Sequence, residues 1–125
     1  MKSLIKEYKI NATIDEIFEA LTDPEIIEEW SGNYAEMDAR AGGKFSFWEG
    51  SIYGINKEIS KNKIIQEWFE ESWDKPSKVT ITMEENNGVT NLKLVHINIP
   101  DGSLESIKEG WDESYFGPLI ELVEG

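Results

Sequence analysis

A single histidine, His96, is the residue of this 125-residue chain best suited to proton transfer near neutral pH. Leu92, Leu94, His96 and Asn98 are alternate residues of one predicted strand. Their side chains are therefore expected on the same, largely apolar face of that strand. There the imidazole could line a cavity and donate to a ligand carbonyl, or it could be a buried histidine satisfied by a neighbour. A catalytic base would need an orienting carboxylate or a nucleophile, and no motif supplies one.

Aromatic residues are abundant, with five tryptophans, five phenylalanines and four tyrosines. Six of them fall on faces of predicted strands and helices that should point inward: Trp30, Phe45, Phe47, Trp68, Trp111 and Tyr115. Aromatic walls with few polar groups are how concave sites hold flat or acyl ligands. The same residues could instead form an ordinary packed core, because periodicity cannot show whether a void exists. These six residues and His96 are therefore the candidate lining of a ligand cavity.

Two further tryptophans, Trp48 and Trp73, lie near predicted turns rather than on inward faces. If they are exposed, they indicate a contact surface, since tryptophan is over-represented among interface hot spots. Packing at the rim of the core is the alternative. Trp73 is the candidate residue for a partner surface.

Metal, cofactor and phosphate sites find no support in the sequence. The absence of cysteine excludes disulfides, thiolate metal sites and cysteine nucleophiles. Acidic clusters are expected by chance among 25 acidic residues, and no segment has the twelve-residue calcium-loop pattern. Gly42-Gly43-Lys44 lacks the phosphate-loop spacing and precedes a predicted strand. We therefore expect no metal and no cofactor.

The chain carries 12 basic and 25 acidic residues, a formal net charge of −13. Such a field repels nucleic acids and anionic membranes, whereas a basic or amphipathic partner would be attracted. The charge could equally serve solubility alone. Runs of consecutive hydrophobic residues never exceed two, far short of the roughly 20 that span a bilayer. We therefore expect a cytoplasmic protein that binds neither nucleic acid nor membrane, and the sequence leaves its oligomeric state open.

The elements that must position these residues begin with a strand over residues 2–10. A helix should start at Thr13, whose spacing to Glu16 makes a capping box, and end near Thr22. A second short helix should start at Asp23-Pro24 and end at Gly32.

From Tyr34 to Ile99 the sequence predicts about six strands separated by turns, as in a meandering antiparallel sheet. Glu49-Gly50 and residues 86–88 are predicted turns, and Gly54 marks a bulge or a close approach of another chain segment.

The last predicted element is a long helix with apolar residues at steps of three or four: Leu104, Ile107, Trp111, Tyr115, Leu119 and Leu122. Gly117-Pro118 should kink or break it. A curved antiparallel sheet of six or seven strands wrapped on this helix, with two short helices after the first strand, would bury all these faces in one α+β domain over residues 1–125.

Several stretches are similar to known proteins. They are Ala20-Leu21-Thr22-Asp23-Pro24-Glu25 with Trp30, Ala41-Gly42-Gly43-Lys44-Phe45, Gly50, Gly54, Trp68, and Gly110-Trp111 with Tyr115 and Phe116. With the element order, they resemble the helix-grip fold of the START-like (SRPBCC) superfamily, in the branch named after the activator of the 90-kDa heat shock protein ATPase. Residues 64–82, with Ser72-Trp73 and Val79-Thr80-Ile81-Thr82, look especially like the C-terminal domain of the eukaryotic co-chaperone.

The resemblance implies a non-enzymatic, chaperone-activator-like domain. Its partner would be a chaperone ATPase of the 90-kDa heat shock class, or a small hydrophobic ligand held between the sheet and the long helix. The alternative is a small cyclase- or hydrolase-like enzyme that uses His96 in the cavity.

Overall fold

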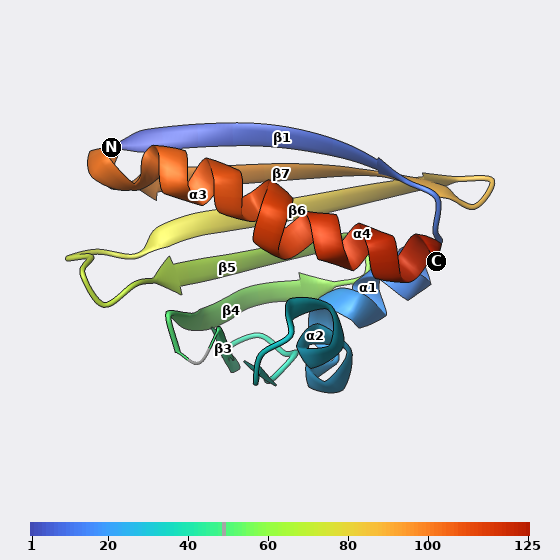
Figure 1. Cartoon of the computed structure of the whole chain (residues 1–125), viewed down its shortest axis with the longest axis horizontal. Coiled ribbons are helices and arrows are strands. Elements are labelled where there is room, and N and C mark those ends of the chain that lie inside the picture. Colours follow the sequence, from blue (N-terminus) through green and yellow to red (C-terminus); the bar gives the residue numbers. More distant parts are fainter. Residues whose placement is uncertain (49) are drawn as a thin grey trace.

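The computed structural model describes residues 1–48 and 50–125. These residues form an antiparallel seven-stranded sheet of order β1-β7-β6-β5-β4-β3-β2, crossed by one long C-terminal helix (Figure 1). The strands are β1 (Lys2–Ile10), β2 (Glu36–Met37), β3 (Lys44–Phe47), β4 (Ile52–Ser60), β5 (Lys63–Phe69), β6 (Ser77–Asn86) and β7 (Val89–Ile99). The helices are α1 (Ile14–Thr22), α2 (Pro24–Ser31), η1 (Asp101–Ser103), α3 (Leu104–Gly110), η2 (Trp111–Phe116) and α4 (Gly117–Glu124). The predicted helix-grip architecture is confirmed.

The local signals that set the two short helices act as predicted. Thr13 and Glu16 form a complete capping box at the start of α1. Asp23 caps α2 through the backbone N–H of Glu25, and Gly32 ends it in the left-handed conformation at φ 76°. Both helices turn an apolar face to the core, and they lie at the end of the molecule where α4 terminates (Figure 1).

Gly54 is the point where two strands and an aromatic ring come together. A Cβ at this position would lie 1.8 Å from the carbonyl oxygen of Glu67 and 2.9 Å from Cζ of Phe45. Only glycine lets β5 and the Phe45 ring approach β4 this closely. The prediction of a close approach at Gly54 is therefore confirmed. Of the predicted turn at Glu49-Gly50, Glu49 lies outside the described residues, and Gly50 has a φ of 90°.

The strict alternation predicted for β7 fails near its end. Leu4 of β1 pairs with His96, but Lys2 pairs with Ile99, so β7 uses three residues where β1 uses two. Asn98 takes up the extra residue with a φ of 62°, a conformation that asparagine tolerates. The prediction for Asn98 is therefore wrong: its side chain is exposed, and Ile99 is buried in its place.

The C-terminal helix continues through Gly117-Pro118 instead of breaking. Residues Trp111–Phe116 widen into a π-helical turn, in which the Gly117 N–H bonds to the Asp112 carbonyl five residues earlier. The extra residue brings both Tyr115 and Phe116 into the core. The Asp112 side chain accepts hydrogen bonds from Lys6 Nζ at 2.6 Å and the Tyr8 hydroxyl at 2.7 Å, which tie this turn to β1. No helix of the described residues is long and apolar enough to cross a membrane.

Candidate ligand-binding pocket

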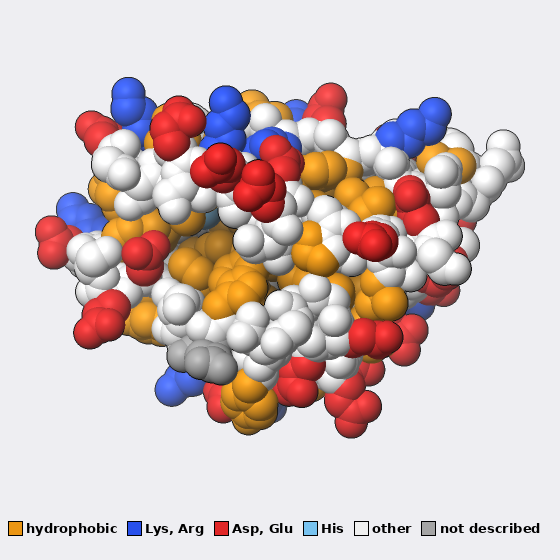
Figure 2. Space-filling model, in the orientation of Figure 1, with side chains coloured by type: hydrophobic (Ala, Val, Ile, Leu, Met, Phe, Trp, Pro, Cys, Tyr) orange, Lys and Arg blue, Asp and Glu red, His pale blue; other side chains and the backbone are white. Residues whose placement is uncertain are grey.

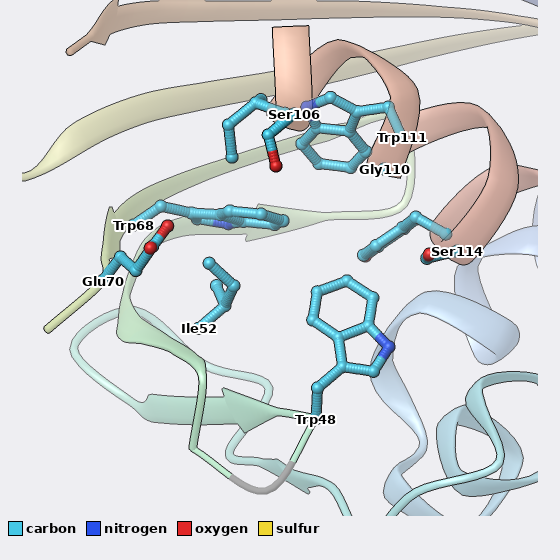
Figure 3. Close-up of a pocket in the computed structure, with 10 residues that line it drawn as sticks. Trp48, Ile52, Trp68, Glu70, Ser106, Gly110, Trp111 and Ser114 are labelled. Atoms are coloured by element: carbon cyan, nitrogen blue, oxygen red, sulfur yellow. The ribbon is translucent and has the colours of Figure 1, made fainter. Parts of the chain in front are cut away.

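A pocket of about 220 Å³ opens between the N-terminal half of the long helix and the sheet, where β4 begins and β5 ends. Its walls are Trp48, Ile52, Trp68, Glu70, Ser106, Ile107, Gly110, Trp111, Ser114 and Tyr115. In Figure 2 this region is a hollow with hydrophobic side chains at its base and acidic side chains around it. In Figure 3, Trp48, Trp68 and Trp111 surround a common space from three different elements.

Trp111 is fixed by a buried hydrogen-bond chain that includes His96. Its indole N–H donates to His96 Nδ1 at 3.0 Å, and His96 Nε2 lies 2.7 Å from the Ser77 hydroxyl. Because Nδ1 accepts, the neutral imidazole carries its proton on Nε2 and donates to Ser77. The Ser77 hydroxyl in turn donates to the Trp68 carbonyl at 3.4 Å. The polar edge of Trp111 is thereby held in the interior.

Trp68 is fixed by a second buried chain. Its indole N–H donates to Gln66 Oε1 at 2.8 Å, Gln66 Nε2 donates to Asn56 Oδ1 at 2.9 Å, and Asn56 Nδ2 donates to the Asp38 carbonyl at 2.8 Å. Trp68 and Trp111 lie with ring centroids 4.7 Å apart. Networks of this kind orient rings before any ligand arrives, so the aromatic wall is preformed.

Burial sets the protonation of two titratable groups here, His96 behind the wall and Tyr115 in it. Burial lowers the pKa of His96 from its ordinary value to about 4, so the imidazole is neutral at pH 7. Burial also raises the pKa of the Tyr115 hydroxyl, which therefore stays protonated. Neither group brings a charge to the pocket.

The structure brings three of the seven predicted cavity residues, Trp68, Trp111 and Tyr115, to the pocket wall. The other four lie in the core outside the lining: Trp30, Phe45, Phe47 and His96. Trp30 donates its indole N–H to the Ala20 carbonyl at 2.8 Å and packs against Tyr115 with ring centroids 4.8 Å apart. These residues support the wall from behind.

Trp48 lines the pocket, although the sequence placed it near a turn and not in the cavity. Its backbone is left-handed at φ 51°, which is unusual for a bulky residue, and its ring packs 6.3 Å from that of Tyr115. Alternation along β3 could not place it, because the strand ends at Phe47. The position of Trp48 depends on a turn conformation that periodicity does not encode.

Trp73, the candidate for a partner surface, is half-buried. Its indole N–H donates to the Ser103 hydroxyl at 3.2 Å, and its backbone N–H closes a turn onto the Glu70 carbonyl at 2.8 Å. The side chain thus joins the β5–β6 connection to the start of the C-terminal helix and lies outside the pocket lining.

The polar groups of the described lining residues are one carboxylate, Glu70, the hydroxyls of Ser106, Ser114 and Tyr115, and the indole N–H of Trp48. Across the described residues, no three histidine, aspartate or glutamate side chains gather closely enough to hold a metal ion. The arrangement can therefore bind a group through aromatic faces and one carboxylate. Glu70 accepts a hydrogen bond from the Ser72 hydroxyl at 3.5 Å, and no described hydrogen bond joins it to Ser106 or Ser114 as a base would be joined to a nucleophile.

Comparison with known proteins agrees with this architecture. The activator of 90 kDa heat shock protein ATPase homolog of Dictyostelium discoideum is 43% identical over 74 residues, which are 56% of this chain and 19% of that protein. Homolog 2 from Mus musculus is 29% identical over 119 residues, 91% of this chain and 35% of that protein. The chain thus spans about a fifth to a third of these curated relatives.

A solved structure is similar over its full length. The crystal structure of an HSP90 activator from Plasmodium falciparum superimposes with a TM-score of 0.92 at 31% identity, covering 98% of this chain and 96% of that one. Residues 11–124 also match the family described as "Activator of Hsp90 ATPase homolog 1-like protein". The chain therefore belongs to the Activator of Hsp90 ATPase homolog 1-like family, in the START-like fold.

Proposed function

We propose that this domain is a non-enzymatic binding module that takes a small apolar group into the pocket lined by Trp48, Trp68 and Trp111. The preformed aromatic wall around about 220 Å³ of space carries this proposal. Pockets for drug-sized ligands usually span about 300–1,000 Å³, whereas a cavity of about 150 Å³ suffices for benzene. The size therefore fits one small ligand or a single side chain of a partner.

The placement of His96 favours binding over the cyclase- or hydrolase-like alternative. An acid–base role would need the imidazole within hydrogen-bond reach of a substrate. His96 instead has 0% of its surface exposed, and both ring nitrogens are engaged by Trp111 and Ser77. Its pKa of about 4 also lies far from the neutral range that suits a general base.

The test uses naphthalene, an uncharged apolar probe, and the indole N–H signals of the ¹⁵N-labelled protein. Binding in the pocket should shift the signals of Trp48, Trp68 and Trp111, and leave those of Trp30 and Trp73 in place. Equal shifts of all five signals, or none, would contradict the proposal.

Gly110 offers a matched pair of variants for the same test. It lines the pocket in the helix, and a Cβ there would meet nothing within 4 Å. Gly110→Leu should fill the space and abolish naphthalene binding, whereas Gly110→Ala should retain most of it. Gly102→Leu adds the same side chain at an equally open position outside the lining, and it should bind as the parent chain does.

Chaperone binding is the second candidate, favoured by the likeness to the Plasmodium falciparum HSP90 activator over 96% of that chain. We propose that the domain docks on a chaperone of that class through its acidic surface and the region of Trp73. The expected result is binding that weakens as salt is added and weakens further in Trp73→Ala. A pull-down with parallel ATPase measurement checks this, and affinity unchanged by both salt and substitution would refute it.

A further inference from the structure

Among the described lining residues, the pocket offers its ligand ring faces and one carboxylate, and its donors are the hydroxyls of Ser106, Ser114 and Tyr115 and the indole N–H of Trp48. The indole N–H groups of Trp68 and Trp111 both donate into the interior, to Gln66 and His96. None of the ten lining residues is lysine, arginine or histidine. Each indole face is the electron-rich side of its quadrupole, which attracts cations.

A carboxylate lies at the edge of the tryptophan rings that line the pocket. Glu70 lines the pocket, and in Figure 3 its side chain lies beside Trp68 at the margin of the space. Within the described part of the chain, no lysine or arginine forms an ion pair with Glu70. Its charge is therefore available to a ligand.

The surrounding surface is also acidic. Exposed Glu105, Glu109 and Glu113 follow one another at steps of four along the helix, and each directly precedes a pocket residue. Residues 11–33 and 100–125, which form the helical layer, hold fourteen acidic residues and one basic residue, so they carry the whole net charge of −13. Seven of these acidic residues and the basic residue lie in residues 100–125, the segment that borders the pocket. The field at the pocket mouth thus favours a cation over a neutral or anionic ligand.

We propose that the pocket recognises an organic cation, of the alkylated ammonium class, in the space bordered by the ring surfaces of Trp48, Trp68 and Trp111, with Glu70 as counter-charge. Trp68 and Trp111 contact each other, so the cation packs against the parts of these rings that face the pocket. This inference rests on the proposed function, because it names the ligand class for the same pocket. Three indoles, a tyrosine and a carboxylate around one small space are the groups that hold quaternary ammonium ions, which are large, weakly hydrated and unable to donate hydrogen bonds.

The experiment compares choline with 3,3-dimethylbutan-1-ol, in which carbon replaces the nitrogen and the shape is unchanged. Choline should bind about tenfold more tightly, as judged by titration of the indole signals of Trp48, Trp68 and Trp111. Equal or tighter binding of the alcohol would overturn the inference. If naphthalene binds without any preference for choline, only the ligand class is wrong; if no probe binds, the proposed function fails too.

Two neighbouring carboxylates supply the control. Glu70→Gln should weaken choline several-fold and leave the alcohol unchanged, whereas Glu71→Gln, outside the lining, should change neither. A loss of choline affinity that is the same in both variants would refute the role of Glu70. A peptide with one trimethyllysine is compared with the same peptide carrying unmodified lysine. If the protein binds only the trimethylated peptide, the cation belongs to a partner protein. If the protein binds choline but neither peptide, the ligand is a free organic cation.

Discussion

The environment of His96 admits only the neutral imidazole. Its Nδ1 accepts the indole N–H of Trp111, so a proton added there would confront another donor. Burial removes the water that would stabilise the charge and lowers the pKa to about 4. The only histidine of the chain therefore stabilises the fold and positions a pocket tryptophan.

This arrangement predicts a loss of stability in mild acid. Between pH 6.5 and about 4 the unfolded chain binds a proton on His96 that the folded chain does not, so the free energy of unfolding decreases as pH falls. The decrease should reach about 3 kcal/mol at pH 4. Urea titrations across this range, compared with His96→Gln, isolate the effect from the carboxylates. If the free energy of unfolding fell equally with pH in both proteins, His96 would not be the cause of the acid-induced loss of stability.

Trp48 combines ligand contact with an unfavourable backbone conformation. Trp48→Asn should abolish naphthalene binding, because one wall of the pocket is lost. Asparagine tolerates the φ of 51° better, so relief of backbone strain offsets the lost ring packing, and the free energy of unfolding should change by less than about 1 kcal/mol. Calorimetric titration checks the loss of naphthalene binding, and urea unfolding of the same sample checks the small change in stability. A variant that is globally unfolded would contradict the prediction of a small change in stability.

At the level of elements, the C-terminal helix shows where sequence patterns succeed and fail. Steps of three and four correctly placed Trp111, Tyr115 and Leu119 in the core. They missed Phe116, which is fully buried because the π turn adds a residue between buried positions. A period of 3.6 cannot describe a turn of that width. The π turn also accommodates Pro118, and this is why the expected break is absent.

Two glycines of this helix should respond oppositely to alanine. Gly110→Ala should raise the free energy of unfolding by about 0.5–1 kcal/mol, because the new Cβ meets open space and helix propensity improves. At Gly117, the Cβ would lie 2.3 Å from the Asp112 carbonyl oxygen in the π turn, so Gly117→Ala should lower it by about 1–3 kcal/mol. Urea unfolding of both variants measures these changes. If the two substitutions changed the free energy of unfolding in the same direction, the π turn would not require glycine at position 117.

On the scale of the molecule, topology was predictable and the void was not. Caps at Thr13 and Asp23, turn residues and alternation determine which faces are apolar, and one sheet gripping one helix is the arrangement that buries them. The same alternation put Phe45 and Phe47 beside Trp68 as equal candidates. Whether a ring fills the core or borders a pocket depends on the volumes of all its neighbours, which no periodicity records.

Charge is unevenly distributed over the molecule. The helical layer, residues 11–33 and 100–125, carries the whole net charge, whereas the rest of the chain holds equal numbers of acidic and basic residues. Helices α1 and α2 have no basic residue, and α2 has none in its last turn to complement the helix dipole. Exposed Glu29 lies in that turn, four residues after Glu25. Glu29→Lys should therefore stabilise the fold by about 0.5–1 kcal/mol at low salt.

The matched substitution Glu84→Lys, exposed on β6, should change stability little, because it lies in the balanced part of the chain. Urea unfolding at about 0.05 M and 1 M salt tests the mechanism, since at 1 M the Debye length of about 3 Å screens charges on neighbouring turns. The advantage of Glu29→Lys should shrink at high salt. If it persisted there, helix propensity and not the field of the acidic layer would account for it.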